Sequence, residues 1–485
     1  MTPVAVLITI ASYFLILFTI SYIAGRKADN EGFFVGNHKS AWYVVAFAMI
    51  GSSISGVTFV SVPGMVGISN FSYLQMVLGF VTGQIIIAFV LIPLFYRMNL
   101  VSIYEYLENR FGTSSYKTGA WFFFISKILG AAVRLYLVCL TLQLLVFEPF
   151  HMPFIMNVIL TVALVWLYTF RGGVKSLIWT DSLKTFCLIV SVVLCIYYIS
   201  TDLKLSFTEM FSTVSDSALS HMFFFDNVND KRYFFKQFLA GVFTMIAMTG
   251  LDQDMMQRNL SCKNFKDSQK NMITSGISQF FIILLFLMLG VLLYTFTSHQ
   301  GITNPAKSDE LFPMIATGGY FPTIVGILFI IGLISSAYSA AGSALTALTT
   351  SFTVDILGIK GKTEDTVRKT RKKVHVGMAI VMGIVIFIFN LLNNTSVIDA
   401  VYILASYTYG PILGLFAFGI LTKRKVRDRY IPLVSILSPI LCFILQKNSE
   451  TWFHGYQFSY ELLIFNALFT FIGLRFLIKK TINLT

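Results

Sequence analysis

The stretch SSAYSAAGSALTALTTS, residues 335–351, places eight serine and threonine side chains inside an apolar segment that runs from about residue 321 to residue 356. Five of these hydroxyls follow one another at intervals of three and four residues, so that on a helix they form one polar stripe: Ser336, Ser339, Ser343, Thr346 and Thr350. Because hydroxyl groups gain nothing against lipid, we expect the stripe to face another helix or a water-filled site.

The composition of the whole chain is that of an integral membrane protein. Of its 485 residues, 56% are hydrophobic and only 12% are charged, and the mean hydropathy is +0.75. The five cysteines show no CxxC spacing, and we interpret them as small core residues and not as a disulfide or metal framework. The chain is therefore predicted to be all-α and embedded in a lipid bilayer.

The apolar segments predict the number and direction of the membrane spans. A bilayer core about 30 Å thick needs roughly 20 apolar residues per helix. By that measure the chain has about thirteen spans, near residues 3–25, 40–66, 71–97, 117–147, 152–170, 177–199, 235–251, 272–297, 321–356, 374–392, 396–421, 430–446 and 459–478. With the N-terminus outside, most of the 36 Lys and Arg residues fall in inner loops. We therefore expect a cytoplasmic C-terminus and a place in the cell's inner membrane, and the net charge of +13 reflects topology and not nucleic-acid binding.

Ionisable residues inside the spans are costly and are therefore candidates for function. Lys127 and Arg134 are seven residues apart on one face of the fourth span, where we expect Lys127 to reach toward an interface and Arg134 to stay near the middle. Asp181 and Lys184 are neighbours on one face of the sixth span, where a structural ion pair is the alternative to a functional site. Asp399 begins the eleventh span, where a carboxylate commonly serves as a favourable helix-end charge.

The second span contains GSSISGVTFVSVPG, residues 51–64, in which glycines and one proline alternate with hydroxyl side chains. Such a cluster allows a helix to break inside the membrane, where freed carbonyls can hold a cation and freed N–H groups an anion. The alternative is an unbroken helix whose small residues pack against a neighbour.

No catalytic motif accompanies this polarity. The six histidines lie in loops or at span ends, and HExxH, GxSxG and phosphate-binding loops are absent from the sequence. We predict a gradient-driven transporter of a small solute and not an enzyme, with no cofactor except a coupling ion and no obligatory protein partner. A channel and a membrane-embedded solute sensor are the competing interpretations.

The chain resembles the sodium/solute symporter family, which includes sodium/glucose, proline and sialic acid transporters. The resemblance covers nearly the whole chain and rests on GSSISGVTFVSVPG (51–64), YTFRGGVKSLIWTDSLKTF (168–186), GLDQDMMQRNLSCKN (250–264) and SAYSAAGSALTALTTSFTVDI (336–356). It implies a LeuT-type fold with an extra N-terminal helix and inner loop in residues 1–39. Inverted repeat one would occupy residues 40–199, an outer loop 200–234, inverted repeat two 235–421, and additional helices 422–485.

The resemblance also implies a sodium site between the broken span and the polar stripe. Its carbonyl ligands would come from Gly51, Ile54 and Ser336, and its hydroxyl ligands from Ser339 and the next residue, which here is Ala340. One oxygen ligand of the family pattern is therefore missing. A second sodium site, found in some members, would use Asp181 with Gly342 and Ser343, and Gly342 again supplies no side-chain oxygen.

Lys184 stands where relatives often have glutamine. Its ammonium would be a fixed cation beside a site that has lost oxygen ligands, and like charges repel. We hypothesise that Lys184 replaces the ion, so that coupling is to protons through Lys184 or Asp181, or is absent. The alternative is that Lys184 pairs with Asp181 while a four-ligand sodium site still works.

The match to the sialic acid branch implies the substrate residues. Ser53, Ser55 and Thr58 take its substrate-facing positions, and Arg134 falls where that branch binds the substrate carboxylate. A guanidinium suits this role because its planar fork binds a carboxylate with two hydrogen bonds. Gln75 is a further expected donor. We predict a small polar, carboxylate-bearing solute such as a sugar acid, the alternative being that Arg134 pairs with Asp181 or a backbone carbonyl.

Overall fold

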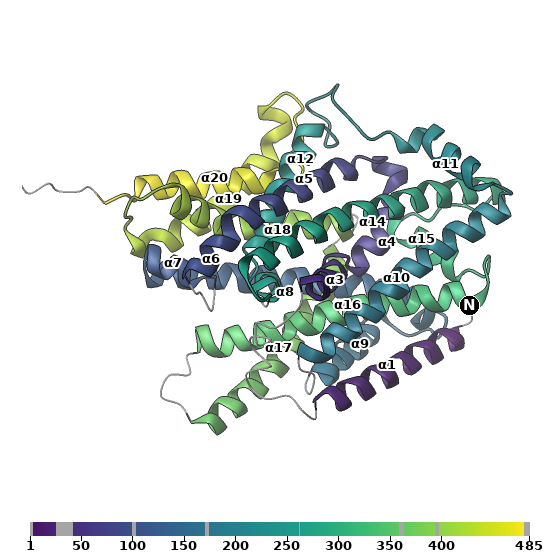
Figure 1. Cartoon of the computed structure of the whole chain (residues 1–485), viewed down its shortest axis with the longest axis horizontal. Helices are drawn as coiled ribbons and strands as arrows, with labels where there is room; N and C mark the ends of the chain where they lie inside the picture. Colours follow the sequence, from purple (N-terminus) through teal and green to yellow (C-terminus); the bar gives the residue numbers. More distant parts are fainter. Residues whose placement is uncertain are drawn as a thin grey trace, which may run out of the picture.

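The computed structural model describes residues 3–25, 42–98, 103–169, 174–260, 262–357, 363–392 and 397–479, and every named element within them is a helix (Figure 1). The longer helices are α1 (Pro3–Gly25), α3 (Trp42–Ser53), α4 (Gly56–Ser69), α5 (Tyr73–Ile86), α8 (Thr113–Leu142), α9 (Phe154–Thr169), α10 (Val174–Asp202), α12 (Phe234–Met245), α14 (Phe265–Gln300), α16 (Thr323–Ser351), α17 (Glu364–Leu392), α18 (Val397–Leu421), α19 (Ile431–Trp452) and α20 (Leu462–Phe476). Shorter helices are α6 (Ile92–Met98), α7 (Glu105–Arg110), α11 (Phe207–Asp216), α13 (Gln253–Leu260) and α15 (Leu311–Thr317). Short π-helical turns continue four of them, namely η2 (Ile87–Leu91), η3 (Gln143–Phe147), η5 (Ile246–Gly250) and η7 (Phe352–Ile356).

Each of the thirteen predicted spans contains a helix. Within the described ranges, eight helices are long and apolar enough to cross a membrane, and the pair α3 and α4, bent by 52°, makes a ninth if it is counted as one span. Four shorter apolar helices lie at the other predicted positions, in α1, α9, α12 with η5, and α20. The all-α prediction is confirmed, while the full number of thirteen spans stays a prediction.

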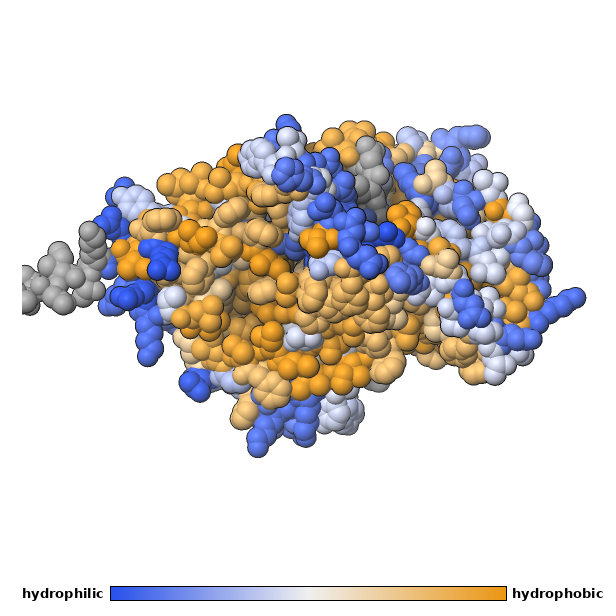
Figure 2. Space-filling view, turned by 90° about the horizontal axis from the view of Figure 1, so that it is seen from above, coloured by the Kyte–Doolittle hydropathy of each residue, from blue (hydrophilic) through white to orange (hydrophobic). Residues whose placement is uncertain are grey.

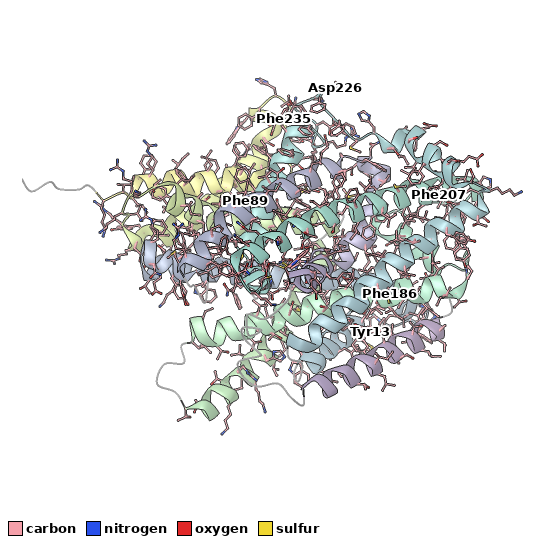
Figure 3. All side chains as sticks on the ribbon, viewed as in Figure 1. Tyr13, Phe89, Phe186, Phe207, Asp226 and Phe235 are labelled. Carbon is pink, nitrogen blue, oxygen red and sulfur yellow. The ribbon has the colours of Figure 1, made fainter. Side chains whose placement is uncertain are left out.

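Most of these helices run along the long axis of the molecule, with α11 at one end and α7 at the other (Figure 1). We call these the α11 end and the α7 end. Hydrophobic residues cover much of the middle of the face in Figure 2, while hydrophilic residues gather at its left and right ends. Phe89, Phe186 and Phe235, labelled in Figure 3, are 60%, 60% and 52% exposed. Large exposed aromatic side chains in an apolar belt are typical of a surface that faces lipid.

Glycines let α5 and α12 pack backbone against backbone. A Cβ atom built on Gly79 would lie 2.2 Å from the carbonyl oxygen of Phe238, and one on Gly241 would lie 2.1 Å from that of Met76. Such distances exclude any side chain, as is common where membrane helices approach closely. This contact fixes the position of α12 against α5.

The loop between α11 and α12 is fastened to the start of α5. Gln75 is fully buried, and its amide donates to the carbonyls of Ser72 (3.2 Å) and Arg232 (2.9 Å) and accepts from the N–H of Phe224 (3.2 Å). Both polar atoms of Gln75 are thus occupied by the loop. The geometry does not support the expectation that Gln75 binds substrate, because its amide holds the loop instead.

Arg232 is the second fastening of this loop. Its guanidinium pairs with Asp230 at 2.8 Å, donates to Asn70 Oδ1 at 3.0 Å and lies 4.4 Å from the centre of the Phe224 ring. The hydrogen bonds from Arg232, opposed in part by burial, lower the pKa of the Asp230 carboxyl. The charged pair therefore helps to hold the loop over the α11 end.

We predict that Gly79→Val and Gly241→Val each destabilise the protein by about 1–3 kcal/mol, because the added side chain must force α5 and α12 apart. Thermal unfolding in detergent measures the effect. Gly377→Ala is the matched control, since its added Cβ meets nothing within 4 Å. Equal unfolding temperatures in all three variants would contradict the close contact.

A second prediction concerns the pH range over which the loop stays fastened. The pKa of Asp230 is lower in the folded protein than in the unfolded chain. The stability that its pairing with Arg232 gives the loop is therefore complete above the ordinary pKa of about 4, and it is lost as the pH falls through the lower folded pKa. Amide exchange of residues 221–233, corrected for its intrinsic rate, should show the same protection between about pH 5 and pH 8. Asp230→Asn should lower that protection equally across this range, and a loss that appears only at the acidic end would argue against the account.

Candidate functional site

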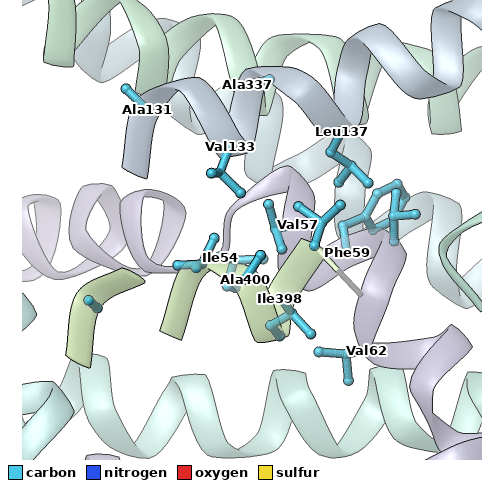
Figure 4. Close-up of a cluster of buried hydrophobic side chains, with 14 of the residues drawn as sticks. Ile54, Val57, Phe59, Val62, Ala131, Val133, Leu137, Ala337, Ile398 and Ala400 are labelled. Carbon is cyan, nitrogen blue, oxygen red and sulfur yellow. The ribbon is translucent and has the colours of Figure 1, made fainter. Parts of the chain in front are cut away.

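The second predicted span is broken, as the alternation of glycine and serine in it suggested. Helix α3 ends at Ser53 and α4 begins at Gly56, and Ser55 caps α4 by accepting the N–H of Thr58 at 3.3 Å. Apolar side chains surround this break, including Ile54 and Val57 next to Val133 of α8 (Figure 4). The prediction of a helix break is confirmed. The C-terminal end of α3, which bears the freed carbonyls, lies inside the packed bundle.

The polar stripe on α16 lies against this break. A Cβ on Gly56 would be only 3.6 Å from the Cβ of Ser336, so the two backbones pass close to each other. Ser336 is completely buried, and its hydroxyl has no hydrogen-bond partner among the described residues. Ser339 is 7% exposed and lines a cavity together with Ala340 and Ser343.

The donor set at this meeting point fits a small cation. A helix that stops at Ser53 leaves its last carbonyls without helical donors, and Gly51 and Ile54 lie at that end. The buried hydroxyl of Ser336, which has no partner among the described residues, belongs to the residue that passes the break at Gly56. Unwound carbonyls and hydroxyls are the oxygen ligands by which broken membrane helices hold sodium. Ala340 faces the same cavity without an oxygen, as the sequence indicated.

A second break, which the sequence analysis did not predict, lies between α12 and α13. The π turn η5 ends at Gly250 and α13 begins at Gln253, so that Leu251 and Asp252 form the break. Asp252 caps α13: its carboxylate accepts the N–H of Met255 at 3.2 Å and its carbonyl that of Met256 at 3.0 Å.

Lys127 of α8 is bound to this second break. Its ammonium lies 3.1 Å from both carboxylate oxygens of Asp252 and 3.3 Å from Asp254, and Tyr409 of α18 donates to Asp252 at 2.9 Å. The side chains of Lys127 and Asp252 are only 9% and 5% exposed. The expectation that Lys127 reaches toward an interface is therefore wrong, because the buried carboxylate of Asp252, 125 residues further along the chain, and the carboxylate of Asp254 neutralise it inside the bundle.

The two breaks open onto one cavity between α8, α16 and α18. Its α8 wall carries Ser126, Lys127, Gly130 and Arg134. Arg134 is half-buried, and its guanidinium makes no hydrogen bond or ion pair in the part of the chain that the structure describes. The cavity therefore contains one cation that is neutralised, Lys127, and one that is available, Arg134.

Tyrosines close the bundle beside the cavity toward the N-terminus of α18. Tyr73 and Tyr402 share a hydrogen bond of 2.7 Å, and the rings of Tyr402 and Tyr460 are 5.1 Å apart. Tyr460 in turn donates to Asp399, so this carboxylate has a specific partner and is more than a helix-end charge. Toward the other end of α18 the cavity is bounded by Thr408 and Tyr409.

The cavity brings together only some of the predicted site residues, since Gly51, Ile54, Ser336 and Gln75 are buried and do not line it. Ser55, Arg134, Ser339 and Ser343 line the cavity, whereas Ser53 is half-buried and Thr58 is buried, and neither is a lining residue; Ser52 lines it instead. The side chains of Asp181 and Lys184 in α10 lie outside the described part of the chain. Sequence reasoning missed Asp252, Asp254 and Tyr409, although the motif GLDQDMMQRN that contains the two carboxylates had been singled out.

Comparisons with known proteins agree with this architecture. A sequence model of the Sodium:solute symporter family matches residues 33–428. The chain is similar to the sodium/sialic acid symporter NanT of Aliivibrio fischeri, with 26% identity over 90% of this chain and 86% of that protein. It is also similar to the sodium/sialic acid symporter SiaT of Proteus mirabilis, with 24% identity over 83% of this chain and 82% of that protein. The human sodium-coupled monocarboxylate transporter 2 is 25% identical over 81% of this chain and 64% of its own length.

Among solved structures, a Na⁺-coupled sialic acid symporter in a substrate-bound, outward-open state superposes with a TM-score of 0.80, at 20% identity, over 97% of each chain. This likeness shows the fold, which is the LeuT type implied by the resemblance. With a family match that extends over most of its length, the chain belongs to the sodium:solute symporter family and is a secondary active solute symporter of the membrane, not an enzyme.

Proposed function

We propose that this symporter imports a small carboxylate-bearing solute, which Arg134 binds in the central cavity. The observation that carries the proposal is that the guanidinium of Arg134, which lines the central cavity, makes no hydrogen bond or ion pair with the described residues. A cation without a partner inside a helix bundle is unfavourable, and an anionic ligand removes that cost. The planar fork of an arginine is well matched to a carboxylate.

The lining of the cavity suits a polar solute. Ser52 and Ser55 at the first break and Ser339 and Ser343 on α16 supply hydroxyl groups around the cavity. The relatives include symporters of sialic acid, which is a sugar acid, and of monocarboxylates. Both classes share a carboxylate, which is the group that Arg134 would bind.

Sodium is proposed as the coupling ion, held by Gly51, Ile54, Ser336 and Ser339 where α4 passes α16. The buried hydroxyl of Ser336 and the carbonyls freed at the break support this site. The replacement of the ion by Lys184, with coupling to protons or no coupling, remains the alternative. Substrate contacts from Ser53 and Thr58 and a second ion site at Asp181 and Ser343 remain part of the proposal.

We further propose that residues 40–199 and 235–421 are inverted repeats, with 1–39 and 422–485 added before and after them and 200–234 between them. The helix breaks at Ile54–Ser55 and Leu251–Asp252 each fall in the first span of a proposed repeat, which supports this division. The α11 end would face outside and the α7 end the cytoplasm, in the inner membrane of the cell.

Arg134→Ala should weaken binding of an anionic solute by about 100-fold, because the variant loses a charge-assisted, bidentate contact in a buried site. Calorimetric titration with sialic acid and with lactate measures this loss. Arg134→Lys should be intermediate, since it keeps the charge and loses the fork. Unchanged affinity for both solutes in Arg134→Ala would contradict the proposal.

Uptake into proteoliposomes tests the ion. An inward sodium gradient should drive uptake of the bound solute, and Ser339→Ala should raise the sodium concentration needed for half-maximal uptake several-fold. Thr346→Ala is the control, because that hydroxyl already bonds to the carbonyl of Gly342 at 2.9 Å. Full sodium dependence would exclude replacement of the ion by Lys184, whereas uptake driven by protons without sodium would exclude the proposed sodium site.

A further inference from the structure

Four charged side chains line the central cavity: Lys127, Arg134, Asp252 and Asp254. Their formal charges sum to zero, but the two cations do not share the ion pairs equally. The three hydrogens of the Lys127 ammonium face three carboxylate oxygens, at 3.1, 3.1 and 3.3 Å. Lys127 therefore forms ion pairs with both carboxylates of the cavity, and Arg134 forms an ion pair with neither.

We infer that Lys127 determines substrate specificity by occupying Asp252 and Asp254, so that Arg134 stays available to an anionic solute. Lys127 acts here as a positioning residue and does not itself contact the solute. This inference rests on the proposed function, in which Arg134 binds the carboxylate.

The path between the two cations is open. Lys127 and Arg134 are seven residues apart on α8, which places their Cα atoms about 10 Å apart along the helix axis. Between them lies Gly130, which also lines the cavity, and a Cβ added there would meet nothing within 4 Å. Among the α8 residues that line the cavity, Gly130 is the one between Lys127 and Arg134, and an arginine side chain is long and flexible enough to turn toward the carboxylates.

The other contacts of Asp252 cannot replace Lys127. The Met255 N–H and the Tyr409 hydroxyl donate hydrogen bonds to its carboxylate, but both are neutral groups. Without Lys127 the cavity would hold two carboxylates and one cation. The Asp252 carboxylate would then have lost the ammonium that neutralises it, so that it would attract Arg134 and repel an incoming anion.

The charge arrangement also favours recognition at one end of the cavity. The available cation, Arg134, lies two turns along α8 from Lys127, while the carboxylates lie at the second helix break. A solute carboxylate is thus attracted to Arg134 and repelled from the break. A solute without a carboxylate gains nothing from this arrangement.

The test compares the affinities of purified variants for sialic acid and lactate, with their uncharged methyl esters as controls, at one saturating sodium concentration. Lys127→Gln should weaken binding of the two anions about tenfold, as expected for removing a positive charge about 10 Å away at an effective dielectric of about 20. Binding of the methyl esters should change by less than about twofold. Lys127→Arg, which keeps the charge, should bind the anions as wild type does.

The decisive variant removes the whole cluster. Lys127→Gln combined with Asp252→Asn and Asp254→Asn leaves Arg134 as the one charged residue of this set, and asparagine still caps α13. It should regain wild-type affinity for the anions or exceed it. A triple variant that binds as weakly as Lys127→Gln would overturn the inference, because Lys127 would then contact the solute itself or be needed for the fold.

The remaining outcomes are also distinguishable. Wild-type affinity in Lys127→Gln overturns the inference. If Lys127→Gln does not fold, the triple variant still decides, since weak anion binding there overturns the inference and strong binding supports it. Arg134→Ala is measured beside them: normal anion binding in that variant contradicts the proposed function, whereas lost binding there with normal binding in Lys127→Gln contradicts the inference alone.

Discussion

Charge neutralisation inside the membrane is the constraint on which the central site depends. A cation within the bundle must find an anion in the protein or in a ligand. Lys127 finds Asp252 and Asp254, while Arg134, two turns further along α8, finds none among the described residues. The protein thereby holds one satisfied ion cluster and one unsatisfied cation in a single cavity. That asymmetry distinguishes a binding site from a structural salt bridge.

Two helix breaks beside the cavity supply the rest of the site. At Ile54–Ser55 the break exposes carbonyls beside the buried Ser336, and at Leu251–Asp252 it turns a carboxylate toward Lys127. Breaks inside a membrane are tolerated only where the freed groups find partners in protein or in a polar cavity. Close packing at Gly79 and Gly241 holds α12 in place, and this fixes the position of the second break beside the cavity.

Much of the fold and part of the site could be predicted from the sequence. Apolar length located the helices, and the glycine and serine residues of 51–64 predicted the first break, because these features are local. The second break could not be predicted in this way, since GLDQD contains one glycine and reads as a loop after a span. Lys127 and Asp252 are 125 residues apart, so only the fold brings them together. The contacts of Gln75 could not be predicted for the same reason, because its partners belong to a distant loop.

A structure determined by electron cryo-microscopy with sodium and sialic acid would test most directly whether Arg134 binds the solute carboxylate. The solute carboxylate should lie within hydrogen-bond distance of both terminal nitrogens of Arg134, with Lys127 still bound to Asp252 and Asp254. A structure in which Arg134 pairs with a carboxylate of the protein, or in which the solute carboxylate binds elsewhere in the cavity, would contradict it.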